Sequence, residues 1–172
     1  MASQYPPYIS LMNNTRRRAG GWVVSLGAAL LFAVPAQAQV LPGLVGQWEA
    51  YEIGFTMAET VPDSVRERLN DPQTAALNHS MAEGLTHLRV EFRADGSYQF
   101  TVTRGEDVVQ NETGTYAVAR GRLQASSPSS PSGSSFDGHQ IRKLSRRVLL
   151  LSFPMGEHMP GVEEEVEYRR VK

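Results

Sequence analysis

Histidines and acidic residues are the side chains of this sequence that could hold a metal ion. His79, His87, His139 and His158 are scattered, and none has a second histidine two or four positions away, the spacing that would place two imidazoles on one side of a strand or helix. A distant pair could still meet in the fold. The spacing itself predicts no metal site, and we expect histidines at the surface or at the rim of the fold.

An acidic run near the C-terminus is the other candidate for cation binding. Glu163 to Glu165 are followed by Glu167, but the segment lacks the Asp, Asn and Gly residues of a calcium-binding loop. Its alternation with Val166 and Tyr168 is typical of a strand. We therefore interpret the acidic residues as the solvated face of a strand.

Nothing in the sequence has the pattern of a catalytic centre. The serine-rich stretch Ser126 to Ser135 contains no G-x-S-x-G nucleophile motif, and no glycine-rich phosphate loop occurs. The chain has no cysteine, which excludes disulfides, thiolate metal ligands and a cysteine nucleophile. The sequence therefore predicts a protein that is not an enzyme and carries no cofactor.

The N-terminal segment has the layout of a cleavable export signal. Arg16 to Arg18 precede an apolar run from Trp22 to Val34, and Ala36 and Ala38 form an A-x-A cleavage site. The apolar run is short for a membrane span, which favours cleavage over a retained anchor. Met12, just ahead of the arginines, is an alternative start.

We therefore expect residues 1–38 to be an N-terminal extension and signal, and residues 39–172 to be one domain outside the cytoplasm, in the periplasm or secreted. Cleavage would remove three arginines and none of the 18 acidic residues, which leaves an acidic domain. An acidic domain without a basic stripe argues against nucleic acid as a partner. Without a cysteine to carry a lipid, no stable membrane anchor is expected after cleavage.

The first predicted strand spans residues 44–53 and positions the only tryptophan of the expected mature domain. Alternation puts Gly46, Trp48 and Ala50 on one face, with polar residues on the other. Trp48 is the largest apolar side chain, and Gly46 marks a close approach of another chain segment. The pattern indicates a strand with one buried side, and we expect Trp48 in the core.

Two short helices are predicted between the first and second strands. Pro62 begins one that ends by Asn70, and Asp71 caps a second that stops at Gly84. The apolar positions of the pair are Val65, Leu69, Leu77 and Met81. Such an insertion could close the mouth of a barrel or cover the outer face of a strand, and we lean towards the mouth.

Beyond the helices the pattern returns to alternation. Seven further strands are expected within residues 86–93, 98–103, 108–119, 123–125, 140–144, 148–153 and 164–171. Asp95-Gly96 between two alternating runs is a strong hairpin signal. Short strands in direct succession favour an antiparallel meander. The stretch Ser126 to Gly138 is expected to be an exposed, mobile loop. Val148 to Leu151 is apolar on both faces, so we expect cover on its outer side, which only the helices could supply.

The motifs together resemble those of the bacterial lipocalin-like domains, which are calycin-type β-barrels. The shared features are Leu44-x-Gly46-x-Trp48, Val90 to Tyr98, Gly114-Thr115-Tyr116, Leu149-x-Leu151 and Glu167-Tyr168-Arg169. The resemblance implies an all-β fold, an up-and-down antiparallel barrel of about eight strands, here with a two-helix insertion between strands 1 and 2. It also implies that Gly46 and Trp48 close one end of the barrel and that Arg169, or else Arg170, packs across the tryptophan.

Two functions from different classes are compatible with such a barrel. In the first, the interior binds a small apolar ligand, lined by Trp48, Val90, Phe92, Tyr98, Phe100, Tyr116 and Tyr168, with Leu88 and Val166 as further candidates. In the second, these side chains fill the barrel, as eight strands allow, and the protein is an envelope structural or protein-interaction module without a small-molecule ligand. An open cavity would favour the first and a filled interior the second.

Overall fold

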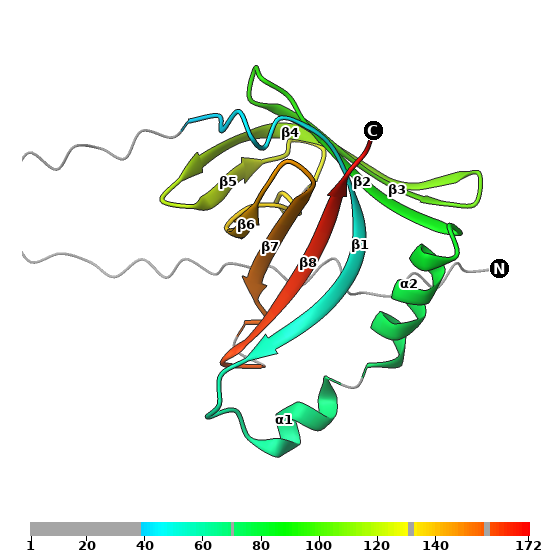
Figure 1. Ribbon diagram of the computed structural model, residues 1–172, viewed down its shortest axis with the longest axis vertical. Coiled ribbons are helices and arrows are strands. Elements are labelled where there is room, and N and C mark those ends of the chain that lie inside the picture. Colours follow the sequence, from blue (N-terminus) through cyan, green and yellow to red (C-terminus); the bar gives the residue numbers. More distant parts are fainter. Residues whose placement is uncertain (1–38, 70, 131–132, 157–158) are drawn as a thin grey trace, which may run out of the picture.

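The computed structural model describes residues 39–69, 71–130, 133–156 and 159–172, so the predicted signal lies outside the described residues. Eight antiparallel strands follow one another around a closed barrel, and the last pairs with the first (Figure 1). The strands are β1 (Gly46–Met57), β2 (Thr86–Phe92), β3 (Ser97–Arg104), β4 (Asp107–Ala119), β5 (Arg122–Ser126), β6 (Gln140–Leu144), β7 (Val148–Pro154) and β8 (Val162–Arg170). Helices α1 (Asp63–Arg68) and α2 (Pro72–Ala82) lie between β1 and β2. The predicted fold class and its two-helix insertion are confirmed.

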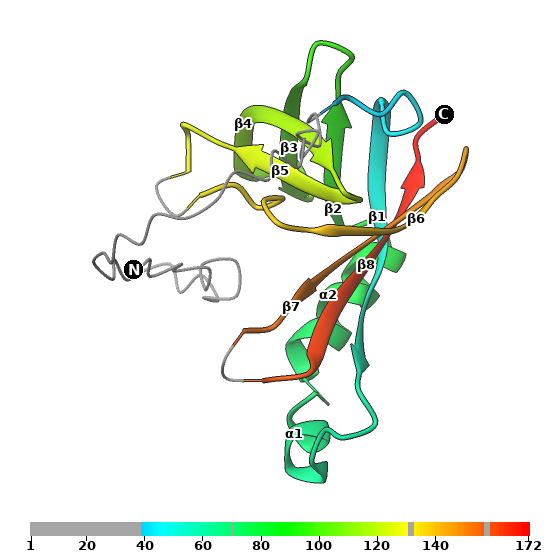
Figure 2. The same ribbon diagram turned by 90° about the vertical axis from the view of Figure 1, so that its left-hand side faces the viewer.

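The meander places successive connections at alternate ends of the barrel. One end, which we call the closed end, has residues 39–45 and the turns after β2, β4 and β6. The other end, the mouth, has the helical insertion, the turn after β3, the loop from β5 to β6 and the segment between β7 and β8. Figures 1 and 2 show the C-terminus at the closed end and α1 beyond the mouth.

Strand β1 changes neighbours along its length. It pairs with β2 only over Gly46 to Glu49, but it pairs with β8 as far as Met57. A register shift between Ala50 and Glu52 adds one residue to β1. Because such a bulge reverses the alternation, Trp48 and Ala50 are followed on the buried face by Ile53.

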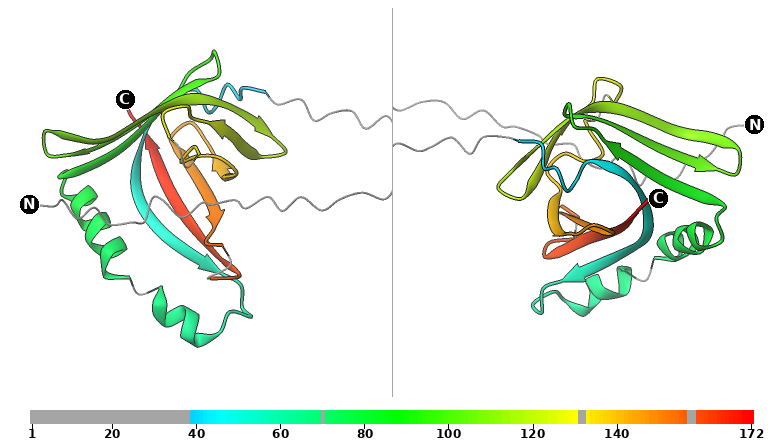
Figure 3. Two further views of the ribbon diagram at one scale, coloured as in Figure 1. Left: turned by 180° about the vertical axis from the view of Figure 1, so that it is seen from behind. Right: turned by 45° about the horizontal axis from the view of Figure 1, so that its top comes forward.

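Beyond Glu49, where β2 no longer pairs with β1, helix α2 lies along β1 instead (Figures 1 and 3). Asn78 accepts a hydrogen bond from the Ile53 amide at 2.9 Å and donates one to its carbonyl at 2.8 Å. Ser80 and Thr86 share a hydrogen bond of 2.7 Å between their hydroxyls, which ties the helix to β2. The helix therefore completes the barrel wall at the mouth end.

The predicted cover of the Val148 to Leu151 strand by the helices is wrong. Helix α2 packs against β1 and β2, with Leu77 and Met81 on the main core. Its predicted cap is confirmed, since Asp71 accepts from two backbone amides of the first turn. Helix α1 packs elsewhere, where Val61 and Val65 form a separate small cluster with Val162 at the start of β8.

The serine-rich segment between β5 and β6 is only in part the exposed loop that its composition predicts, since Pro128, Ser129 and Gly133 are exposed but other positions are not. Ser127, Ser134 and Phe136 are buried, and Phe136 has only 1% of its surface exposed. Serine, proline and glycine do favour turns. The bulky apolar Phe136 nevertheless draws the segment into the barrel, where it packs with the core.

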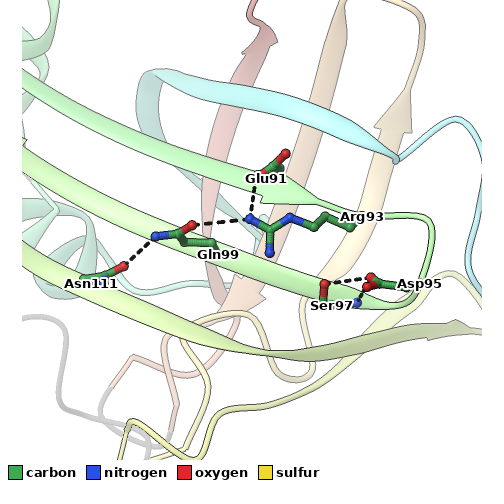
Figure 4. Close-up of polar contacts among 6 residues, drawn as sticks. All are labelled: Glu91, Arg93, Asp95, Ser97, Gln99 and Asn111. Carbon is green, nitrogen blue, oxygen red and sulfur yellow. Dashed lines mark hydrogen bonds and ion pairs between the residues drawn. The ribbon is translucent and has the colours of Figure 1, made fainter.

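The outer face of β2, β3 and β4 is polar, as the alternation predicts. Arg93 donates to the Glu91 carboxylate at 2.6 Å and to the Gln99 side-chain carbonyl at 3.3 Å (Figure 4). Gln99 in turn donates to Asn111 at 3.1 Å. In the hairpin turn, the Ser97 amide and hydroxyl both donate to Asp95, which holds the pKa of that carboxyl below its usual value (Figure 4). This network belongs to the solvated side of the sheet.

Candidate ligand-binding site

The interior near the closed end is filled by its own side chains. Trp48, Phe92 and Tyr98 are completely buried, and their polar atoms have partners. The Trp48 indole N–H donates to the Leu44 carbonyl at 2.8 Å, and the Tyr116 hydroxyl donates to the Arg93 carbonyl at 2.8 Å. This half of the barrel has the packing and hydrogen bonding of an ordinary protein core.

Arg170 closes this end, and the assignment of that role to Arg169 is wrong. The Arg170 guanidinium lies 4.1 Å from the centroid of the Trp48 ring and donates to the Val45 carbonyl at 2.8 Å and to the Gly43 carbonyl at 2.7 Å. Arg169 faces outward, with its guanidinium over the Tyr51 ring. The reason is parity, since Tyr168 and Arg170 share the inner face of β8 and Arg169 lies between them.

Gly46 makes this closure possible. A Cβ atom at this position would lie 2.2 Å from Nη1 of Arg170, and the residue has a φ of +133°. Both the space and the backbone conformation require glycine. Gly46, Trp48 and Arg170 thus form one unit at the closed end.

An acid in the middle of the barrel anchors the loop between β5 and β6. Glu112 faces inward from β4, is 3% exposed and accepts a hydrogen bond from the Tyr98 hydroxyl. The Ser135 amide and hydroxyl donate to the same carboxylate, at 3.1 Å and 2.6 Å. Because a buried carboxylate needs several donors, the loop is held inside the barrel by the acid it satisfies.

The ring of Phe136 fills the space beside this acid. Its centroid lies 5.7 Å from those of Phe92 and Tyr98 and 5.2 Å from that of Phe100, each in an edge-to-face arrangement. Such pairs stabilise a core beyond the area they bury. The middle of the barrel is therefore occupied by a side chain from its own loop.

The interior towards the mouth differs, because several of its apolar side chains are only partly buried, while others there, such as Ile53, Val102 and Val162, are buried. Leu88 faces inward from β2 opposite the core residue Val102. Leu77 and Met81 of α2 are also partly buried against the main core. Phe55 is partly buried against the small cluster beside α1, and Phe153 is partly buried on β7. These side chains retain contact with solvent, as Val40, Leu41 and Leu144 also do at the edge of the closed end.

One row of residues crosses the inner face of four neighbouring chain segments here. Phe55 on β1 is paired with Glu164 on β8, and Glu164 is paired in turn with Phe153 on β7. His139, just before β6, stacks on Phe153 with the two ring centroids 4.4 Å apart. Because barrel strands are staggered, the row runs from the mouth at Phe55 to the buried His139.

Three polar groups on this inner face have no hydrogen-bond partner within the described part of the chain. They are the Glu164 carboxylate, the Tyr168 hydroxyl and Nδ1 of His139. Burial raises the pKa of Glu164 to about 7 and lowers that of His139 to about 4. Burial, together with the nearby charge of Glu164, also raises the pKa of Tyr168. Of the three, only Nδ1 of His139 is a fully buried atom, whereas Glu164 is partly exposed and Tyr168 lies four residues further along β8. Unpartnered polar groups inside a fold are uncommon.

The structure brings all seven predicted ligand-lining residues into one core. Trp48, Val90, Phe92, Tyr98, Phe100, Tyr116 and Tyr168 are each at most 5% exposed. Whether they touch a ligand stays a prediction, but most belong to the filled half. Tyr168 is the one that lies beside an unpartnered acid.

Sequence reasoning missed Glu164, His139 and Phe153 as site residues. Glu164 was interpreted with its neighbours as solvated, although its even number places it on the same strand face as Val166 and Tyr168. That parity was visible in the sequence. The stacking of His139 on Phe153 depends on the register of β6 with β7, and no pattern in the sequence predicts it.

Within the described residues, no group of three or more His, Asp or Glu side chains is arranged to hold a metal ion. None of the helices in the same part of the chain is both long enough and apolar enough to cross a membrane.

No protein-family model and no curated protein sequence matches the chain. Among solved structures, it is similar to bovine odorant-binding protein in complex with a selenium-containing odorant, at 18% identity over 79% of this chain and 75% of that one, with a TM-score of 0.35. A complex of the same bovine protein with undecanal matches at 18% identity over 79% and 76%, with a TM-score of 0.34.

Proposed function

We propose that this chain is an exported binding protein that holds a small apolar molecule in the mouth half of its barrel. The observation that carries the proposal is a group of inward-facing apolar side chains near the mouth that are only partly buried. Leu88, Phe55 and Phe153 face inward but are only partly buried, whereas inward residues of the closed half such as Trp48 are completely buried. Partly exposed apolar surface inside a concave wall is the usual setting for small-ligand binding.

A neutral apolar fluorophore, N-phenyl-1-naphthylamine, tests this proposal by titration. We expect saturable binding with enhanced probe fluorescence. Leu88→Glu places a charge on the inner wall and should weaken binding by about tenfold, because the carboxylate must be desolvated next to the probe. Arg89→Glu changes the neighbouring outward-facing position and should leave binding unchanged. Equal binding by both variants would place the probe elsewhere.

Export rests on the signal pattern of residues 1–38, which lie outside the described residues. Intact-mass measurement of the extracytoplasmic protein should give a chain that begins at Gln39, or within one or two residues of it. Recovery of the full-length chain in the inner membrane would contradict the proposal.

A filled barrel that acts through a protein partner is the second candidate. It is favoured by Phe136, which occupies the middle of the interior, and by exposed apolar side chains of Leu85 and Val108 near the mouth. The two candidates differ in the same titration. If N-phenyl-1-naphthylamine fails to bind both the unaltered protein and Phe136→Ala, the interior takes no apolar guest and the second candidate stands.

A further inference from the structure

Glu164 is placed unlike the other acids of the described chain that face the barrel interior or line its rim. Glu112 has the Tyr98 hydroxyl and the Ser135 amide and hydroxyl as donors. Glu163 faces outward and forms an ion pair with Arg142. Glu164 faces inward with neither a donor nor a cation among the described residues.

Among the described residues, the side chains that neighbour Glu164 supply no positive charge. Across the register, β1 presents Phe55 and β7 presents Phe153. On its own strand the flanking inward residues are Val162 and Val166. Among the described residues, the titratable groups that share this face with Glu164 are Tyr168 and His139, and burial favours the neutral form of both at pH 7. A carboxylate in such surroundings is stabilised by any cation that enters.

Tyr168 is a further polar residue on the inner face of β8. Only 5% of its surface is exposed, and its hydroxyl has no partner among the described residues. It shares the inner face of β8 with Glu164, whose charge acts on it. Nδ1 of His139, in a side chain 6% exposed, is a further unpartnered polar atom along the row.

We infer that the mouth half of the barrel takes an apolar amine, whose ammonium group is held by Glu164 and whose apolar body lies against Phe153, Phe55 and Leu88. The inference rests on the proposed function, since it names the class of ligand for that same site. A protonated amine has several N–H donors. One of these donors reaches the Glu164 carboxylate as a charge-assisted hydrogen bond.

Three ten-carbon ligands that differ only in their head group test this inference by calorimetric titration at neutral pH. They are decylamine, decanol and decanoate, which present a cation, a neutral hydroxyl and an anion. We expect decylamine to bind about tenfold more tightly than decanol, because the amine adds a charge-assisted hydrogen bond. Decanoate should bind more weakly than decanol, because its carboxylate would face that of Glu164.

Glu164→Gln keeps the shape of the side chain and removes its charge. In this variant decylamine should bind only as well as decanol, while decanol should bind as it does to the unaltered protein. Glu165→Gln is the matched control, since it removes a neighbouring carboxylate that faces outward, and it should preserve the preference for the amine. Near-ultraviolet circular dichroism checks that both variants are folded.

The outcomes separate the two proposals. If decanol and decylamine bind equally to the unaltered protein, the barrel binds apolar molecules and the amine inference is overturned. If the preference survives in Glu164→Gln, the cation is held elsewhere and the inference is again overturned. If none of the three ligands binds, the proposed function itself fails.

Discussion

The two halves of this barrel are built from the same strands with the same alternation. They differ in how completely their inward-facing polar groups are hydrogen-bonded. At the closed end, Trp48 and Tyr116 are buried and each polar atom donates to a backbone carbonyl. Towards the mouth, Glu164 faces the same interior without a partner among the described residues. Folding alone explains the first half, whereas the second has polar groups that a ligand would complete.

The comparison also shows where stability and binding are separated. Completely buried aromatic side chains at one end supply the core, so the other end can keep incomplete burial at a tolerable free-energy cost. The loop that carries Phe136 marks the boundary, because it fills the middle and meets the mouth row at His139.

Trp48→Ala should have the largest effect on stability. Emptying a completely buried aromatic site costs about 3 to 5 kcal/mol of unfolding free energy. Phe153→Ala, in the partly buried row near the mouth, should cost only about 1 to 2 kcal/mol. Urea denaturation of both variants measures the difference. Equal losses would mean that the two halves contribute alike to the core.

The part of this contrast that concerns the closed end follows from sequence patterns. Gly46 and Trp48 stand on one face of an alternating strand, and their burial follows from that alternation alone. Asp71 before Pro72 predicts the start of α2 through local hydrogen bonds. These features depend on residues close together in the chain, which is why a pattern reveals them.

The mouth could not be predicted in the same way. The position of α2 depends on the point at which β2 leaves β1, and that point is set by pairing between distant residues. The inward turn of the serine-rich loop depends on Glu112, more than twenty residues earlier in the chain, as its buried partner. Composition alone favours an exposed loop there, because it carries no information on such distant partners.

Phe136→Ala should have the next largest effect. Removing the ring that lies among Phe92, Tyr98 and Phe100 should cost about 2 to 4 kcal/mol, somewhat less than a strand position because the loop can adjust. The same change removes a side chain from the middle of the barrel and should strengthen binding of N-phenyl-1-naphthylamine. Stability loss with unaltered probe binding would show that the probe does not reach the site of the lost ring.

Glu164 should make the unfolding free energy depend on pH. Its pKa is raised to about 7 in the folded protein, above the ordinary 4.5, so the folded state holds a proton that the unfolded chain has released. This contribution is fully present below pH 4.5 and is lost as the pH rises through 7. Relative to the unaltered protein, Glu164→Gln should gain on the order of 1 to 3 kcal/mol between pH 5 and pH 8.

Chemical denaturation at the two pH values measures that gain. His139 acts in the opposite sense, because its lowered pKa of about 4 removes stability as the pH falls from 6.5 through 4. His139 is present in both proteins, so its contribution cancels when their unfolding free energies are compared. Glu165→Gln, which changes an outward carboxylate, should show no such gain, and an equal gain would mean that surface charge is responsible.

The two neighbouring arginines at the end of β8 give the smallest and most local test. Arg170→Met should cost about 1 to 2 kcal/mol, since it removes a cation–π contact with Trp48 and leaves the carbonyls of Gly43 and Val45 without their donor. Arg169→Met removes an arginine over the exposed Tyr51 ring and should cost less than about 0.5 kcal/mol, as expected of a surface contact. Methionine keeps most of the aliphatic stem in both cases, so the difference reports on the guanidinium. Thermal unfolding followed by Trp48 fluorescence measures both variants, and Arg170→Met should also shift the emission of the indole. If Arg169→Met proved the more destabilising, the closed end would depend on its outer face, and the contrast with the mouth would lose its physical basis.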